Sequence, residues 1–569
     1  MTLAEKIGQM TQVDTAALPD KSHIQKYALG SVLSGGGSDP KENTPQGWLH
    51  LAETCQGWSQ KTRLKIPLLY GVDAVHGHNN VLGAVIFPHH LGLGATRNPA
   101  LVQQAARVTA REIAGTGINW AFAPCIAVAQ DARWGRTYES FSDNPELTGE
   151  LGAAVVRGLQ ADFREPGAVL ACAKHFVGDG GTQGGVDQGN TVVDEATLRK
   201  IHLAPYRPAI QAGVGSVMIS FSSWNGAKMH GHKHLITDVL KGELGFQGFT
   251  ISDWAAIDQL PHDYKGSIAA AINAGLDMAM IPNGPGQPNN YVDFITKLTE
   301  LVNEGRVPLA RIDDAVRRIL RTKLAVGALT AQPVDAALTA AIGSPAHRQV
   351  ARECVQQSLV LLKNDRGTLP LAKDLKHVQV VGAAANDLGI QCGGWTISWQ
   401  GDTGNITPGG TTILEAIRQT VGRDTKVSFS PEVTKTEAAD AIIVVVGELP
   451  YAEMKGDRPD LLLAAADTDL IKRARQNGVP VVTILLSGRP LILGDALAAS
   501  DAFVAAWLPG TEGRGVTDVL FGDVKPTGKL PRVWPQSATG QDHFPFGFGL
   551  TYDGVSTSAP QIKTASASH

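Results

Sequence analysis

Cysteine is scarce in this chain, with five residues in 569, and no two of them form a CxxC pair. An odd, widely scattered set argues against a disulfide framework and against a cysteine zinc site. The chain also lacks an apolar run of about eighteen residues, so the sequence predicts no membrane-spanning helix. No stretch is strongly basic and the net charge is −4. Nucleic acids and anionic membranes are therefore not expected as partners.

The length of 569 residues exceeds what one hydrophobic core usually supports, so at least two domains are expected. A hydrophobic content of 43% and a charged content of 18% are ordinary for a globular protein and exclude general disorder. The chain opens on a helix signature in which Thr2 is the N-cap and Glu5 completes a capping box. No signal peptide precedes this helix. The location is left open, and a secreted or periplasmic protein whose signal peptide is absent from this chain is favoured.

Short apolar runs alternate with amphipathic helical segments from residue 60 to residue 285. The runs are Pro67–Asp73, Ile118–Pro124, Val169–Phe176, Val214–Ser220, Phe249–Asp253 and Leu276–Pro282. Strands that are regularly interleaved with helices indicate βα units and a parallel sheet. The number of units and their span of about 300 residues predict a (β/α)8 barrel rather than a three-layer sandwich.

Polar side chains stand at or near the ends of these runs. They are Asp73, Arg133, Arg136, Lys174, His175, Ser220, Asp253, Trp254 and Asp277. The carboxyl ends of barrel strands form the site face, so we expect these side chains to converge there. Carboxylates and guanidinium groups bond to hydroxyls, and an indole covers an apolar sugar face. The set therefore predicts a pocket for a neutral polyol, although each residue alone is more often a cap or a structural ion pair.

Asp253 follows a buried apolar run and is adjacent to Trp254. Taken alone, this aspartate is more often the N-cap of the next helix. A side chain at the end of a strand is held more rigidly than one on a free loop. The other polar strand ends therefore favour a reacting carboxylate beside a stacking platform.

His76 and His78 have the HxH spacing of a metal-dependent amidohydrolase barrel. Lys174, His175 and Asp253 could superficially complete such a two-metal site. That site also needs isolated histidines at two more strand ends, and the later runs supply none. Structural roles for His76 and His78 are therefore favoured, and no metal is expected.

A second series of strands follows a stretch rich in Ala, Thr and Pro. These strands are Val378–Gly382, Lys426–Phe429, Ala441–Gly447, Val481–Ser487 and Ala502–Trp507. Helices separate them, which predicts a smaller α/β domain. The predicted boundaries are a barrel domain over residues 1–328, an interdomain linker over 329–345, an α/β sandwich domain over 346–555 and a disordered tail over 556–569.

Two Gly-rich loops, 392–402 and 447–458, belong to the second domain. Neither contains GxGxxG or GxxxxGK[ST], so nucleotide binding has little support. Tryptophans in the first loop, and Glu448 and Glu453 in the second, are more typical of sugar recognition. The alternative for the glutamates is a weak surface salt bridge to a neighbouring basic residue.

Together the motifs resemble glycoside hydrolase family 3, and in particular its exo-acting β-glucan glucohydrolases and β-glucosidases. The matching stretches are Leu3–Met10, Gly71–Gly77, Arg133–Arg136, Ala173–Phe176, Ile251–Trp254, the two Gly-rich loops and Phe546–Leu550. This resemblance covers nearly the whole chain. It implies a (β/α)8 TIM-like barrel followed by an α/β sandwich domain, with the active site in the cleft between them. It also implies β-linked glucose oligosaccharides or β-glucan as substrates and no cofactor, while a monomer and a homodimer both stay open.

The resemblance assigns roles to individual positions. The nucleophile falls on Asp253, and the acid/base falls on Glu453, with Glu448 as the alternative. The residues that would hold the terminal glucose are Asp73, Arg136, Lys174 and His175, and those of the aromatic clamp are Trp254 and Trp399. A retaining mechanism follows, in which cationic neighbours keep Asp253 ionised and Glu453, on a less cationic loop, protonates the leaving oxygen.

Three positions depart from related enzymes of that family. Phe221, which the resemblance places among the substrate-binding residues near the nucleophile, stands in place of Tyr. Gln259 stands in place of Arg and Gln188 in place of Glu, and these changes are expected to alter linkage preference or transglycosylation without abolishing hydrolysis. The N-acetylglucosaminidase branch uses a His-Asp pair in the loop that corresponds to residues 178–187, which contains no histidine here. That branch is therefore disfavoured. A β-xylosidase of the same family and a sugar-binding protein without turnover also stay open.

Overall fold

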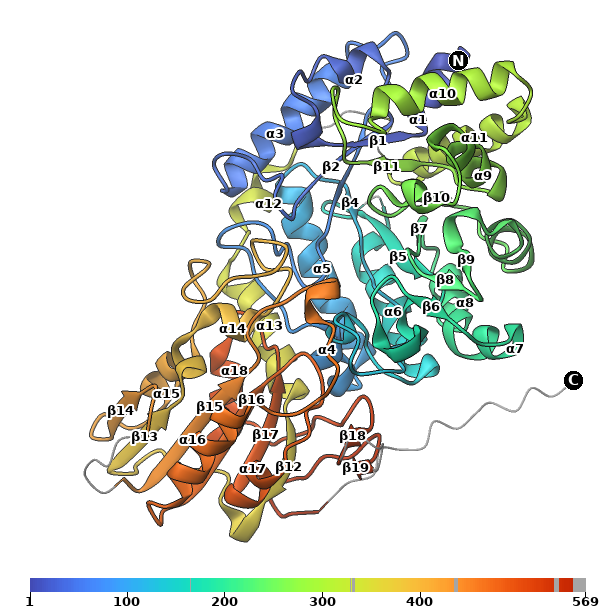
Figure 1. Ribbon diagram of the computed structural model, residues 1–569. Helices are drawn as coiled ribbons and strands as arrows, with labels where there is room; N and C mark the ends of the chain where they lie inside the picture. The colour runs from blue at the N-terminus through green and yellow to red at the C-terminus, as the bar shows by residue number, and fades with distance from the viewer. Residues whose placement is uncertain (164, 328, 330–332, 434–438, 537–541, 556–569) are drawn as a thin grey trace, which may run out of the picture.

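The computed structural model describes the chain from Met1 to Val555 except residues 164, 328, 330–332, 434–438 and 537–541. The predicted tail over 556–569 and part of the predicted linker lie outside the described residues. A barrel, drawn in blue to green in Figure 1, lies beside a second unit built on a sheet, drawn in yellow to red. Within the described ranges, no helix is both long enough and apolar enough to cross a membrane.

The barrel consists of eight short parallel strands. They are β1 (Thr11–Asp14), β2 (Ser31–Ser34), β3 (Leu69–Val72), β4 (Trp120–Ala121), β5 (Leu170–Phe176), β7 (Ser216–Ile219), β10 (Phe249–Ile251) and β11 (Ala279–Ile281). Their order around the sheet is β10-β7-β5-β4-β3-β2-β1-β11. A parallel bridge between Ile251 and Met278 brings the two edge strands together, so the barrel is nearly closed.

Helices cover the outside of the barrel. The main ones are α1 (Leu3–Gln9), α2 (His23–Lys26), α3 (Pro45–Ser59), α4 (His90–Thr96), α5 (Pro99–Gly115), α6 (Pro145–Gln160), α7 (Glu195–Leu198), α8 (Tyr206–Gln211), α9 (Tyr264–Ala274), α10 (Tyr291–Asn303) and α11 (Leu309–Ala325). The predicted capping box of α1 is present, because Thr2 Oγ1 accepts from the Glu5 N–H and Glu5 Oε2 accepts from the Thr2 N–H. The short strands β6 (Asn190–Thr191), β8 (Ser223–Trp224) and β9 (Ala227–Lys228) form a small separate sheet.

The first two barrel strands were not among the predicted runs, because they carry polar residues. Their side chains are buried and bond to one another: Gln12 Nε2 donates to Ser31 Oγ at 2.7 Å. Ser34 also belongs to β2, and its Oγ lies 2.7 Å from the hydroxyl of Tyr70 on β3. Hydrogen bonds of this kind make buried polar side chains tolerable, and such side chains conceal the apolar pattern that marks a strand.

The second unit contains a six-stranded sheet. Its strands are β12 (Val360–Asn364), β13 (His377–Val381), β14 (Lys426–Ser430), β15 (Ala441–Gly447), β16 (Val481–Leu486) and β17 (Ala502–Trp507), in the order β12-β17-β16-β15-β13-β14. The strands pair in parallel except β12, which runs antiparallel to β17. A short hairpin, β18 (Trp534–Pro535) and β19 (Asp542–Phe544), lies at the side of this unit.

Both faces of this sheet are covered. Along β15, Ile443 and Val445 belong to one apolar cluster, whereas Ile442 and Val444 belong to another. Successive side chains of a strand point to opposite faces, so two clusters require helices on both sides of the sheet. The helices are α13 (Pro345–Ser358), α14 (Leu388–Cys392), α15 (Ile413–Thr420), α16 (Ala465–Arg475), α17 (Asp495–Ala499) and α18 (Gly513–Leu520). A further helix, α12 (Ala336–Ala340), falls in the predicted linker and packs against α5.

Candidate active site

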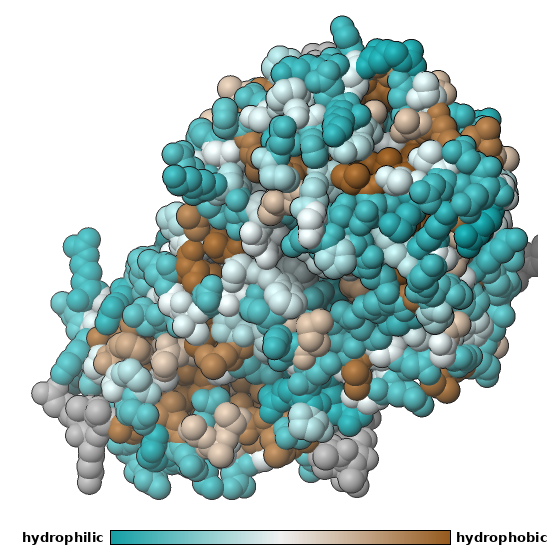
Figure 2. Space-filling view, turned by 45° about the horizontal axis from the view of Figure 1, so that its top comes forward, coloured by the Kyte–Doolittle hydropathy of each residue, from teal (hydrophilic) through white to brown (hydrophobic). Residues whose placement is uncertain are grey.

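A pocket of about 290 Å³ lies where the barrel strand ends face the two Gly-rich loops of the second unit. In Figure 2 the surface of this face is hollowed between the two halves of the molecule. Nine of the residues predicted for the site from the sequence line this pocket: Asp73, Arg136, Lys174, His175, Phe221, Asp253, Trp254, Trp399 and Glu453. Trp395, the other tryptophan of the 392–402 loop that the sequence linked to sugar recognition, also lines it. Met218, Met280 and the glycines at 35 and 36 line it too and were not predicted.

Asp253 follows β10 by two residues and points into the pocket from the barrel. Its Oδ1 accepts from the Trp254 N–H at 2.7 Å, and its own N–H donates to His230 Nε2 at 3.1 Å. Burial raises the pKa of Asp253 to about 6, although Arg136 and Lys174 oppose the rise. Cationic neighbours are therefore present as expected, but burial outweighs them. The carboxyl group is still mostly ionised at pH 7.

Lys174 and Asp73 form an ion pair that lines the pocket, with the lysine buried and the aspartate partly exposed. Lys174 Nζ lies 2.7 Å from Asp73 Oδ1, and the lysine side chain is only 2% exposed. Burial would lower the pKa of Lys174, but the Asp73 carboxylate more than reverses this effect and the pKa lies above its usual value. The pair offers charged donors and acceptors, which suit the hydroxyls of a sugar.

Arg136 is the centre of a charged network that joins the two units. Its Nε and Nη2 donate to the two oxygens of Glu139 at 2.8 and 2.9 Å, while its Nη1 donates to Glu453 Oε1 at 3.0 Å. Its Nη2 is also 3.2 Å from His175 Nε2. Burial would raise the pKa of Glu139, but Arg136 outweighs burial and the pKa lies below its usual value. Glu139 therefore neutralises Arg136 from beneath the pocket and leaves one guanidinium edge for the other groups.

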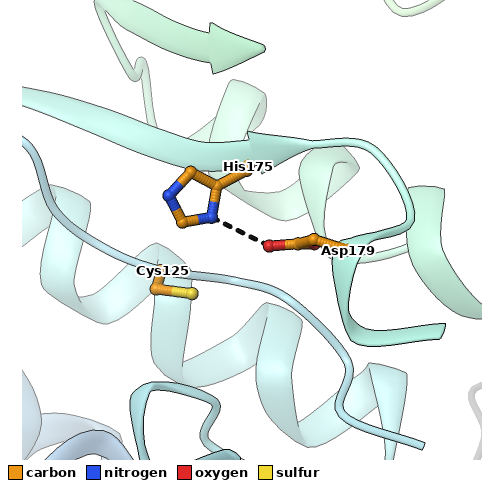
Figure 3. A group of neighbouring side chains, drawn as sticks. All are labelled: Cys125, His175 and Asp179. Atoms are coloured by element: carbon orange, nitrogen blue, oxygen red, sulfur yellow. Dashed lines mark hydrogen bonds and ion pairs between the residues drawn. The ribbon is translucent and has the colours of Figure 1, made fainter. Parts of the chain in front are cut away.

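His175 is held in one orientation by Asp179, as Figure 3 shows. The His175 Nδ1 lies 2.8 Å from Asp179 Oδ2, and burial together with Arg136 and Lys174 lowers the pKa of the imidazole well below its usual value. The ring is therefore neutral. Its Nδ1–H donates to Asp179, and its Nε2 accepts from Arg136.

Cys125 completes the only group of three His, Cys, Asp or Glu residues in the described part of the chain whose ligand atoms lie within 4.8 Å. Burial raises the pKa of the Cys125 thiol far above its usual value. A thiolate is the form that binds metal, and the Nδ1 of His175 is already bonded to Asp179. The group therefore orients His175 and fits a metal ion poorly.

Glu453 enters the pocket from the second unit, on the loop after β15. Trp399 Nε1 donates to its Oε2 at 3.0 Å. Burial raises the pKa of Glu453 to about 8; Arg136 opposes this rise, and the carboxylates of Asp187, Asp253 and Glu139 add to it. The sequence suggested a less cationic surrounding for Glu453, but Arg136 contacts it directly. The charge of Arg136 is, however, already neutralised by Glu139. The carboxyl group is mostly protonated at pH 7.

Glu448, the alternative acid/base, does not line the pocket. Its Oε2 accepts from the Tyr451 hydroxyl at 2.9 Å and from the Gly488 N–H at 3.0 Å, and its Oε1 lies 3.2 Å from Arg458 Nη1. Both oxygens are occupied by groups that do not reach the site. The geometry therefore favours Glu453 over Glu448.

Two of the departures noted in the sequence contact each other at the rim of the barrel. Gln259 Nε2 donates to Gln188 Oε1 at 3.0 Å, and Lys228 Nζ donates to Gln259 Oε1 at 2.7 Å. The same lysine donates to the main-chain oxygen of Phe221 at 2.8 Å. The two positions at which the resemblance implies Arg and Glu carry neutral amides here, and these amides bond to each other. Gln188 and Gln259 are therefore neighbours in the structure, and the two departures affect the same place at the rim.

Three of the predicted polar strand ends do not reach the pocket. Asp277 precedes β11 instead of following it, and it lies fully buried at the opposite end of the barrel, where it pairs with Lys241 at 2.8 Å and with Arg311. The prediction for Asp277 was wrong because it stands at the start of its apolar run. Arg133 is turned away to Asp131 at 2.6 Å. Ser220 Oγ lies 2.8 Å from Ser222 Oγ and is buried.

Two family descriptions together match most of the chain. "Glycosyl hydrolase family 3 N terminal domain" matches residues 2–322, and "Glycosyl hydrolase family 3 C-terminal domain" matches residues 359–552. The chain belongs to glycosyl hydrolase family 3. The predicted family and the predicted fold class are confirmed, and the chain is a glycoside hydrolase.

Curated relatives within family 3 are similar over nearly the whole chain. A lysosomal beta glucosidase of Dictyostelium discoideum is 35% identical, over 98% of this chain and 73% of its own length. A periplasmic beta-glucosidase of Salmonella typhimurium is 30% identical, over 97% of this chain and 79% of its own length. A solved exo-1,3/1,4-beta-glucanase from a Pseudoalteromonas species is 41% identical with a TM-score of 0.91, and the match covers 98% of this chain and 74% of that one.

His76 and His78 do not serve the pocket of this family 3 chain. His76 Nδ1 lies 3.0 Å from the Phe87 carbonyl oxygen, and His78 Nε2 lies 2.9 Å from Thr116 Oγ1. Both histidines are buried and neither lines the pocket, so the HxH spacing is structural.

Glu139 and His230 contact the site residues but were not predicted from the sequence. Glu139 left a local signal, because it follows Arg136 by three residues. His230 left none, because its bond to the Asp253 N–H joins segments 23 residues apart.

Proposed function

We propose that the chain is a retaining, exo-acting β-glucosidase that releases glucose from the non-reducing ends of β-glucans and β-gluco-oligosaccharides. One observation carries the proposal: two carboxyl groups, one from each unit, line the same pocket with pKa values on either side of 7. Burial places the pKa of Asp253 at about 6 and that of Glu453 at about 8. One ionised and one protonated carboxyl group are what glycoside cleavage requires.

In the first step Asp253 attacks the anomeric carbon and the glycosidic C–O bond breaks. Glu453 gives its proton to the departing oxygen, so the leaving group departs as an alcohol. The product is a glycosyl ester on Asp253. Trp399 Nε1 and Arg136 Nη1 are positioned to stabilise the carboxylate that forms on Glu453.

In the second step Glu453 accepts a proton from water, and the water oxygen attacks the anomeric carbon. The ester bond to Asp253 breaks and β-glucose leaves. Retention of this kind needs carboxyl groups about 5–5.5 Å apart. Asp253 and Glu453 are linked through two intermediate side chains: Asp253 Oδ2 lies 3.8 Å from His175 Nε2, which is 3.2 Å from Arg136 Nη2, and Arg136 Nη1 is 3.0 Å from Glu453 Oε1.

The pocket supports an exo mode. Its volume of about 290 Å³ is near the lower end of the range for small-ligand sites. Buried Lys174 and partly exposed Asp73, both of which line the pocket, suit the hydroxyls of one terminal sugar. Trp254, 44% exposed, and the partly buried Trp399 lie on opposite units and are placed to cover the next sugar from two sides.

A hydrolysis panel tests the proposal. β-1,2-, β-1,3-, β-1,4- and β-1,6-linked glucose disaccharides and an aryl β-xyloside are supplied separately, and the first-formed anomer is followed by NMR. We expect release of β-glucose from at least one disaccharide, with xyloside cleaved more slowly. Initial formation of α-glucose would exclude retention, and preferential cleavage of the xyloside would replace the glucosidase proposal with a xylosidase.

A further inference from the structure

We infer that Arg489, outside the pocket, positions the acid/base loop against the barrel; the inference rests on the proposed role of Glu453. Arg489 follows β16 by three residues and its side chain is 0% exposed. Its Nη2 donates to the main-chain oxygen of Gly456 at 2.7 Å. Gly456 ends the single helical turn that Glu453 begins. The guanidinium therefore holds the far end of the turn that carries the acid/base.

The same guanidinium also binds the barrel. Its Nη1 donates to the main-chain oxygens of Ala132 and Arg133 at 3.1 and 3.0 Å. These residues belong to the loop that leads to Arg136, whose Nη1 contacts Glu453. Arg489 thus joins two loops. One carries Glu453, and the other carries Arg136, which is bonded to Glu453.

The two loops are in direct contact in front of Arg489. A side chain in place of the Gly135 hydrogen would lie 1.9 Å from the main-chain oxygen of Glu453, and one at Gly456 would lie 2.9 Å from the Gly135 Cα. Only glycines permit this approach. Glu453 itself has a φ of +53°, a conformation that an L-residue adopts only when its surroundings impose it. Bonds on both sides of the turn supply that constraint.

Glu448 and Tyr451 complete the group around Arg489. Arg489 Nε donates to the Tyr451 hydroxyl at 2.9 Å and lies 3.4 Å from Glu448 Oε1, and the Tyr451 hydroxyl in turn donates to Glu448 Oε2. The guanidinium carbon lies 4.6 Å from the centre of the Tyr451 ring. The glutamate that could be mistaken for the acid/base is therefore the counter-charge of the positioning arginine.

A lysine cannot replace this arginine. The planar guanidinium directs its N–H groups to three carbonyl oxygens and one hydroxyl at the same time, whereas an ammonium group has three N–H groups on one atom. The Arg489→Lys variant therefore keeps the charge beside Glu448 and loses the connection between the loops. This variant therefore separates the role of Arg489 in positioning the loop from its role as a positive charge beside Glu448.

The test compares two substrates that differ in their need for an acid. A β-linked glucose disaccharide needs a proton on the leaving oxygen, and 2,4-dinitrophenyl β-glucoside does not. For Arg489→Lys we expect kcat/KM on the disaccharide to fall at least about 10-fold more than on the aryl glucoside, as for a displaced general acid. The alkaline limb of the disaccharide profile is expected to move to lower pH, because water reaches Glu453. An equal loss on both substrates, or no loss, would overturn the inference.

Arg311→Lys is the matched control. Arg311 also donates to main-chain oxygens, those of Ile272 and Leu276, and pairs with buried Asp277, but it lies at the opposite end of the barrel. The Arg311→Lys variant is expected to have a lower melting temperature and to change kcat/KM by the same factor on both substrates. If Arg489→Lys does not fold, Tyr451→Phe removes one bond to the same guanidinium and must show the same substrate dependence.

Glu453→Ala separates this inference from the proposed function. If Glu453→Ala shows no dependence on the leaving group, the acid/base assignment fails. If Glu453→Ala shows that dependence and Arg489→Lys and Tyr451→Phe do not, only the positioning role of Arg489 fails.

Discussion

The rate of disaccharide hydrolysis should depend on pH through both carboxyl groups. Asp253 must be ionised to attack and burial raises its pKa to about 6, so activity falls below that pH. Glu453 must be protonated to act as an acid and burial raises its pKa to about 8, so activity falls above that pH. At pH 7 each group is one unit from its pKa and about 10/11 in the required form, which leaves about 0.8 of the enzyme active. At pH 5 or pH 9 about a tenth remains active.

The Glu453→Gln variant removes one limb of this profile. The amide has no proton to give, so the residual rate on the disaccharide should fall by about 10²- to 10⁴-fold and lose its alkaline limb. The acid limb near pH 6 should stay, because it belongs to Asp253. The assay measures kcat/KM from about pH 4 to about pH 10 for the unsubstituted protein and for Glu453→Gln. The pKa values obtained from the two limbs are apparent values of a coupled pair of carboxyl groups.

Asp179 is the competing explanation for an alkaline limb, since burial raises its pKa to about 7 and it bonds to His175. Asp179→Asn is therefore the control, and it should keep the limb near pH 8. An alkaline limb that persists in Glu453→Gln and disappears in Asp179→Asn would refute the assignment of the acid.

Glu453→Ala should lose far more activity on a disaccharide than on 2,4-dinitrophenyl β-glucoside and should regain activity with azide. Glu448→Ala should lower stability and, because Glu448 contacts the Arg489 group and does not line the pocket, should show a much smaller dependence on the leaving group and no rescue by azide; steady-state kinetics with and without azide distinguish them. Trp399→Phe keeps an aromatic ring but removes the N–H that donates to Glu453, so the alkaline limb should move to higher pH; a shift to lower pH would contradict that role. Trp254→Ala should mainly raise KM for disaccharides, by about 5-fold for a stacking contact of about 1 kcal/mol; an unchanged KM would remove Trp254 from the clamp. Glu139→Gln breaks a buried pair and should cost about 3–5 kcal/mol in urea unfolding, and the alkaline limb should move to lower pH because a carboxylate near Glu453 is lost.

Much of the fold could be predicted from the sequence, because β-branched and apolar runs mark most strands. The Ala502–Trp507 run coincides with β17, and the alternating clusters along β15 follow directly from its composition. Strands β1 and β2 were missed because they carry buried polar side chains inside the barrel, among them Gln12 and Ser31, which bond to each other.

The site residues could be named from motifs, but their connections could not. Arg489 lies far from Glu448 in the sequence, so nothing local shows that the two form one group. The contacts that favour Glu453 over Glu448 therefore could not be derived from the sequence. For Asp253, the sequence supplied the cationic neighbours but not the burial that outweighs them. That balance depends on how completely the two units exclude water.

The covalent step on Asp253 is the central claim, and trapping the intermediate tests it most directly. A 2-deoxy-2-fluoro-β-glucosyl fluoride slows both steps but keeps an excellent leaving group, so the glycosyl ester should accumulate. Digestion and mass spectrometry should then locate one fluoroglucosyl group on the peptide that contains Asp253, and the Asp253→Asn variant should remain unlabelled. A label on another carboxylate, or time-dependent inactivation without any label, would contradict the account.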